Sequence, residues 1–124
     1  MSYIYLASPY SHPDHMLRAR RWTAAIDACA WIANVKEMAV YSSIAHWHKV
    51  AVRHRLPGHS DYWTRQNEAL LIPAAAVWIL TIDGWKTSVG VAAEMAFANF
   101  QSKPILYLQP LEKRGEYIVR EQPE

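Results

Sequence analysis

Cysteine, long apolar runs and an N-terminal targeting pattern are all scarce or missing in this sequence. A single cysteine, Cys29, excludes an internal disulfide and a multi-cysteine metal site. No apolar run approaches the roughly 20 residues of a membrane span, so we expect no membrane partner. Residues 1–6 lack the basic stretch that opens a secretory signal. These absences predict a cytoplasmic protein.

Charge of either sign is also sparse. Charged residues make up 19% of the chain, and the formal net charge is +2. Such a balance does not by itself argue for nucleic acid as a partner. One segment is more basic, and its members are His46, His48, Lys49, Arg53, His54 and Arg55. A solvated face is the usual meaning of such a cluster, and an edge that faces phosphate is the alternative.

The chain shows no internal repeat, low-complexity tract or composition shift. With 124 residues, 52% of them hydrophobic, it has the size and composition of one globular domain with one core. We therefore treat residues 1–124 as a single domain.

Short apolar runs alternate with longer helical patterns. Strands are expected at residues 3–7, 38–42, 75–82, 104–108 and 117–119. Helices are expected at 14–33, from Ser60 or Asp61 to 71, and at 87–102, with a frayed helix at 44–55. Strands separated by helices imply right-handed crossovers. The pattern predicts an α/β three-layer sandwich with a mostly parallel sheet of about five strands.

Such sheets bind ligands outside the carboxyl ends of their strands, where the strand order reverses. In a flavodoxin-like order the first and third strands flank this point. The candidate ligand contacts are then Ser8, Pro9 and Tyr10 after the first strand, and Asp83, Gly84, Trp85 and Ser88 after the third. Asp83 also has a simpler interpretation as a turn residue, because Asp-Gly favours tight turns.

Glu94 is the only charged residue between positions 87 and 102. The helix there is apolar nearly all round, which predicts burial, and a buried carboxylate without a partner costs several kcal/mol. Ser88 is a suitable N-cap, and Gly90 leaves room for a ligand at the helix start. An ionised, poorly hydrated Glu94 would be a suitable nucleophile toward an anomeric carbon. The alternative is a structural role, in which Glu94 caps a neighbouring backbone or pairs with an arginine such as Arg18 or Arg21.

Two segments carry a family resemblance. The sequence IYLASPY at 4–10 and the sequence SVGVAAE at 88–94 together resemble the nucleoside 2-deoxyribosyltransferase-like superfamily. Residues 41–46 and 83–85 resemble its branch known as domain of unknown function 1937. The resemblance implies an enzyme with a flavodoxin-like fold that is usually oligomeric. Such an enzyme cleaves the N-glycosidic bond of 2-deoxyribonucleosides or their 5′-monophosphates. We expect a homodimer that uses no cofactor.

The resemblance also implies roles for individual residues. Glu94 takes the place of the nucleophile, Tyr5 orients it or the sugar, and Ser88 hydrogen-bonds the sugar or the carboxylate. The acid that protonates the leaving base falls at Asn67, and an amide cannot donate a proton as an acid. Either Asp61 or Glu68 substitutes for it, or catalysis is weakened or absent.

Histidines and tryptophans give weaker signals. His46 and His48 would lie on one side of a strand, a start for a zinc site, but no spacing specifies a third ligand. We therefore predict no metal and expect His46 to pack or to contact substrate. Trp47, Trp63 and Trp85 lie in or near candidate loops where a base could stack, with ordinary burial as the alternative. Trp85 is favoured because it lies beside the predicted crevice.

The function predicted from these signals is cleavage or transfer at the N-glycosidic bond of nucleosides or nucleotides. A non-catalytic nucleotide-binding or sensor domain on the same fold is the alternative that Asn67 favours. A basic module that contacts nucleic acid through residues 46–55 is a third.

Overall fold

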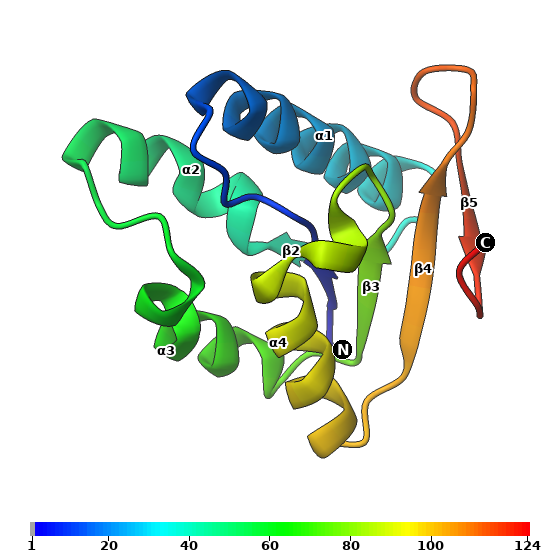
Figure 1. Ribbon diagram of the computed structural model, residues 1–124. Coiled ribbons are helices and arrows are strands. Elements are labelled where there is room, and N and C mark those ends of the chain that lie inside the picture. Colours follow the sequence, from blue (N-terminus) through cyan, green and yellow to red (C-terminus); the bar gives the residue numbers. More distant parts are fainter. Residues whose placement is uncertain (1) are drawn as a thin grey trace.

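The computed structural model describes residues 2–124, and these form one five-stranded sheet and four α-helices (Figure 1). The elements in chain order are β1 Ile4–Ala7, α1 His15–Asn34, β2 Val40–Ser42, α2 Ser43–His54, α3 Ser60–Leu71, β3 Ala76–Leu80, a 3₁₀ turn (η1) Trp85–Thr87, α4 Val89–Phe100, β4 Ile105–Pro110 and β5 Tyr117–Arg120. The predicted α/β class is confirmed.

The strand order is β2-β1-β3-β4-β5, the flavodoxin-like arrangement. Strands β2, β1, β3 and β4 run parallel, and β5 pairs antiparallel with β4. The order reverses between β1 and β3, where Ala7 lies opposite Ile79 in the register. The segments that leave the two strands therefore start side by side.

The core has two parts, one on each face of the sheet. Because side chains alternate along a strand, Leu6 and Trp78 face one side and pack with Ile32 of α1. Tyr5 and Ile79 face the other side, and the cluster there is completed by Leu71 of α3 and by Val91 and Ala98 of α4. Figure 1 shows α1 and α4 on opposite sides of the sheet.

The N-termini of α2 and α3 are each capped by a side chain that accepts a hydrogen bond from a backbone amide. At α2 the Ser42 hydroxyl accepts from the Ala45 amide at 3.0 Å. The segment 44–55, expected as a frayed helix, is a regular helix from Ser43 to His54, and Arg55 ends it in the left-handed conformation. At α3 the cap is His59, whose Nδ1 accepts from the Tyr62 amide at 3.3 Å. Of the two residues predicted to cap α3, Asp61 lies within the first turn, and the side chain of Ser60 is outside the described part of the structure. The cap expected at Ser60 or Asp61 is therefore wrong, because the helix begins at Ser60 and its cap is the residue before it.

Helix α4 differs from the prediction that it is buried nearly all round. Only Val91, Glu94 and Ala98 are buried, while Val89 and Phe100 are 72% and 81% exposed. The reason is geometric, because α4 belongs to an outer layer and the sheet and α3 cover one side of it. Among the described residues, none of the helices combines the length and the apolar character that crossing a bilayer requires.

Candidate active site

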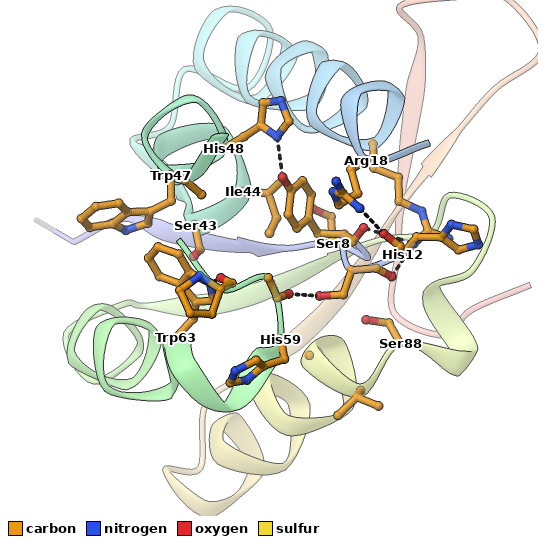
Figure 2. A pocket seen from close by; sticks show the side chains of 18 of the residues that line it. Ser8, His12, Arg18, Ser43, Ile44, Trp47, His48, His59, Trp63 and Ser88 are labelled. Carbon is orange, nitrogen blue, oxygen red and sulfur yellow. Dashed lines mark hydrogen bonds between the residues drawn. The ribbon is translucent and has the colours of Figure 1, made fainter. Parts of the chain in front are cut away.

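A cavity of about 1040 Å³ opens at the carboxyl ends of β1 and β3. Its walls come from the loop after β1, the first turns of α1, helix α2, the loop to α3, helix α3 and the start of α4. Figure 2 shows Arg18 and His12 at one end of the cavity and Trp47 and Trp63 at the opposite end. The volume reaches the upper end of the roughly 300–1,000 Å³ that is typical of ligand pockets.

Glu94 lies on the inner side of α4 and lines this pocket with 8% of its surface exposed. Its Oε2 accepts a hydrogen bond from the hydroxyl of Tyr5, whose side chain is fully buried in β1. Burial raises the pKa of Glu94 to about 7, and the bond from Tyr5 opposes that rise. The pKa of Tyr5 is raised well above its ordinary value, by burial first and then by the Glu94 charge. Tyr5 therefore stays protonated and acts as the donor.

The alternative pairing of Glu94 with an arginine does not occur. Arg18 donates to the carbonyls of His12 and Pro13, in the loop that precedes α1. Arg21 donates to the carbonyls of Tyr10 and Ser11 at 3.4 and 3.3 Å. The Glu94 carboxylate thus lines the pocket and forms no salt bridge with either arginine.

The start of α4 brings Ser88 and Gly90 to the same pocket. The Ser88 hydroxyl oxygen accepts from the Val91 amide at 3.1 Å, so the predicted N-cap is confirmed. That bond uses Ser88 as an acceptor, and its own hydroxyl proton is available to a ligand oxygen. Gly90 presents no side chain at this point.

The loop after β1 contributes Ser8 and Tyr10 to the pocket, while Pro9 is buried behind it. The Tyr10 hydroxyl and the Nδ1 of His48 are 2.5 Å apart and share a hydrogen bond (Figure 2). The His48 ring also stacks on Trp22, with centroids 4.7 Å apart. Burial, and then the charges of Arg18 and Lys49, lower the pKa of His48. The pair joins the β1 loop to α2.

Asn67 also lines the pocket, and its Oδ1 accepts from the Ser43 hydroxyl at 2.7 Å. The two acids expected to replace it lie elsewhere. Asp61 is exposed on the first turn of α3, and Glu68 is also absent from the residues that line the cavity. Glu94 is the only carboxyl that lines this pocket in the described part of the chain. The structure does not bring Asp61 together with Glu94.

Several other candidates lie outside the pocket. Trp85 packs on Tyr107 with centroids 5.8 Å apart and belongs to the core beneath α4. Asp83 is exposed in the turn after β3, where Gly84 alone of the Asp-Gly pair lines the cavity. His46 is exposed and its ring contacts Tyr41 and Trp47. These positions give no support for base stacking by Trp85 or for ligand contacts by Asp83 and His46.

The aromatic wall of the pocket comes instead from Trp47 and Trp63. Their rings lie 5.2 Å apart, and the Trp63 indole donates to the Pro57 carbonyl at 2.9 Å. The residues of the basic segment 46–55 do not share one surface. His48 and Arg55 line the pocket, whereas Lys49 lies over the Trp22 ring. In the described part of the chain, no group of three or more His, Cys, Asp or Glu side chains is placed to hold a metal ion.

Sequence reasoning did not identify Arg21 and Ser43 as pocket residues. Arg18 and Arg21 are three residues apart on a helix, so they share one side of α1. That spacing was the available signal for Arg21. The sequence gives no such signal for Ser43, which is one of two adjacent serines. Only the folded chain shows that Ser42 caps α2 and that Ser43 donates a hydrogen bond to Asn67.

Together these features define a class, a flavodoxin-like α/β domain with one buried glutamate in a pocket at the point where the strand order reverses. A family model described as domain of unknown function (DUF1937) matches residues 2–109, and the chain belongs to this family. The match spans every residue that lines the pocket. No curated protein matches the chain.

Proposed function

We propose that the protein cleaves the N-glycosidic bond of nucleosides or their 5′-monophosphates, by hydrolysis or by transfer to a second base. The observation that carries this proposal is the placement of Glu94, a lone carboxylate that is buried, faces a large pocket and is held by Tyr5 rather than by a cation. A carboxylate in such surroundings is poorly hydrated and reactive toward an electrophilic carbon.

In the first step, ionised Glu94 attacks the anomeric carbon of the sugar as the bond from that carbon to the base breaks. The base leaves with the bonding electron pair and takes up a proton, and a glycosyl ester of Glu94 remains. In the second step, the oxygen of water or an N–H nitrogen of another base attacks the same carbon, releases the carboxylate and loses one proton to solvent. Two displacements retain the configuration at that carbon.

The other pocket residues suit a nucleoside. Trp47 and Trp63 offer aromatic surface for stacking on a base, and Ser88 offers a hydroxyl to the sugar. With no second carboxyl among the lining residues, the departing base takes its proton from water. Tyr5, which donates to Oε2, fixes the plane of the carboxylate.

The test is base release from a panel of nucleosides and 5′-monophosphates by the wild type and by Glu94→Gln. The amide keeps the shape and cannot form the ester, so we expect base release to be lost. Glu68→Gln is the matched control, because it removes a carboxylate that lies outside the pocket. Equal turnover by Glu94→Gln and the wild type would remove Glu94 from the mechanism.

A second candidate is a nucleotide-binding or sensor domain without catalysis. The observation that favours it is Asn67, an amide fixed by Ser43 at the position of the expected acid. This candidate predicts nucleotide binding that survives in Glu94→Gln, together with no base release by the wild type from any compound of the panel.

A further inference from the structure

We propose that Asn67 determines which bases the pocket accepts, and that it selects a base with a carbonyl oxygen over one with an amino group at the same position. The inference rests on the proposed function for the identity of the ligand as a nucleoside. It adds the class of base and the side chain that makes the choice.

The first observation is the place of Asn67 on the pocket wall. Trp63 and Asn67 both line the cavity and are four residues apart, so they lie on the same side of α3. The Trp63 ring is 5.2 Å from that of Trp47, and this pair is the aromatic surface at one end of the cavity (Figure 2). A base that stacks on aromatic rings is recognised by hydrogen bonds to the polar atoms at its edge. Asn67 is the half-buried polar side chain beside that surface.

The second observation is that Asn67 also lies toward the proposed nucleophile. Its partner Ser43 is close to Tyr5, the residue that donates to Glu94. Burial and then the Glu94 charge raise the pKa of Tyr5, and the nearby Ser43 hydroxyl opposes that rise. Asn67 therefore lies between the tryptophans and the Tyr5–Glu94 pair. A base bonded to the sugar carbon that Glu94 attacks would lie in the same interval.

The third observation is the orientation of the amide. Ser43 is only 6% exposed, and its hydroxyl donates to Oδ1 of Asn67 at 2.7 Å. An asparagine amide has one acceptor, Oδ1, and one donor group, the two N–H bonds of Nδ2. In the described part of the chain, Nδ2 has no partner and is not among the unpaired side-chain atoms that are buried. The accessible end of this amide is therefore its donor end.

A donor distinguishes between bases of the same size. Uracil carries a carbonyl oxygen where cytosine carries an amino group, and hypoxanthine and adenine differ in the same way. The N–H of Asn67 can donate to the carbonyl, whereas an amino group would oppose one donor to another and leave both unpaired. Sites that form a hydrogen bond to one group discriminate strongly against an analogue that cannot form it. The geometry thus favours oxo bases over amino bases.

Binding to Glu94→Gln tests the inference without turnover. Isothermal titration would compare deoxyuridine with deoxycytidine, and deoxyinosine with deoxyadenosine. Within the pair that the pocket binds more tightly, we expect the oxo member to bind roughly tenfold better, the scale of one hydrogen bond formed or lost. Adding Asn67→Ala should remove this preference. Gln66→Ala is the matched control, since Gln66 carries the same amide, is exposed on the same helix and does not line the pocket.

Two further variants distinguish recognition by Asn67 from a structural role. Asn67→Asp keeps the shape but presents an acceptor, so the preference should reverse toward the amino member. Ser43→Ala frees the amide to turn its oxygen to the ligand, so affinity for the amino member should rise several-fold. A purely structural role predicts weaker binding of both members in each variant.

Equal affinities for the oxo and amino members would overturn the inference, even if the wild type releases base. A preference that Asn67→Ala and Asn67→Asp both leave unchanged would overturn the assignment to Asn67. A preference that depends on Asn67, without base release by the wild type, would uphold the inference and refute the proposed function. Binding of no nucleoside from either pair would overturn both.

Discussion

In the proposed mechanism, two properties of Glu94 govern its activity as the nucleophile. Its burial raises its pKa to about 7, and its reaction requires the ionised form. Below pH 7 the protonated acid predominates, so the active fraction falls about tenfold for each unit of pH. We predict that kcat/KM for base release rises with pH up to about 7 and then levels off.

A nucleoside is the appropriate substrate for that profile, because a phosphate has its own ionisation near pH 6. The same measurement on a monophosphate would show a second, ligand-derived step. A kcat/KM for the nucleoside that is constant or falls between pH 5 and 7 would contradict the assignment of Glu94 as an ionised nucleophile.

In the proposed mechanism, Tyr5 acts on the reaction through Glu94, as a positioning residue. Its hydroxyl lowers the pKa of Glu94 against the effect of burial. Tyr5→Phe removes this bond, so the pKa of Glu94 should rise further and activity at pH 7 should fall roughly tenfold or more. The pH profile distinguishes this from misfolding, because the variant should recover much of its activity at pH 9. An unshifted profile with a uniform loss would contradict the role.

The sequence identified Glu94 as a site residue but did not identify Arg21. Glu94 was identified because it is the only charge in an apolar helix. Arg21 has Arg18 and Arg20 as neighbours, and only Arg18 and Arg21 line the large pocket, while Arg20 borders a separate shallow groove. Which of the three faces the site depends on the rotation of α1 about its axis, and tertiary packing sets that rotation.

At the scale of elements, the apolar periodicities predicted the strands and the helices α1, α3 and α4 to within a few residues, whereas α2 was expected only as a frayed helix. The wrong predictions concern the residue that caps a helix and the side chains that are buried against it. His59 caps α3 through its ring, which the usual preference for Ser, Thr, Asp and Asn does not include. Trp85 was expected in the crevice, yet η1 turns it onto Tyr107 in the core. Both outcomes depend on loop conformations that periodicity does not specify.

Helix α4 offers a test at this scale, because Ser88 both caps it and lines the pocket. Ser88→Ala leaves the Val91 amide without its acceptor and should lower the free energy of unfolding by about 1 kcal/mol. Urea unfolding would measure the loss. Ser88→Asn keeps an acceptor at this position and should restore stability. A Ser88→Ala variant as stable as the wild type would show that the cap contributes nothing to folding.

At the scale of the whole molecule, the strand order explains why distant residues meet. Placing β1 beside β3 brings Ser8, Arg21 and Glu94 to one cavity, although 86 positions of sequence separate the first from the last. The flavodoxin-like order was a condition of the sequence argument, because periodicity identifies strands but not their neighbours. Once that order holds, the ends of β1 and β3 define the site.

The exposed side of α4 concerns the assembly of the whole molecule. Val89, Ala92, Ala93, Ala96 and Phe100 are exposed there, and none of them carries a charge. Contiguous apolar surface of this kind usually marks an interface. We propose that the same side of a second copy covers it, since helices with small side chains can approach closely about a two-fold axis.

Light scattering after size exclusion should therefore give the mass of a dimer for the wild type. Phe100→Glu replaces the most exposed large apolar side chain of this surface, at the C-terminal end of α4, with a charge and should shift the mass to that of a monomer. Thr23→Glu, which adds the same charge to the exposed side of α1 in the opposite layer, should leave the dimer intact. A wild type that remains monomeric as its concentration rises would contradict the proposed dimer. Because α4 also carries Glu94, loss of the dimer should loosen the helix that holds the proposed nucleophile, and activity should fall together with the mass.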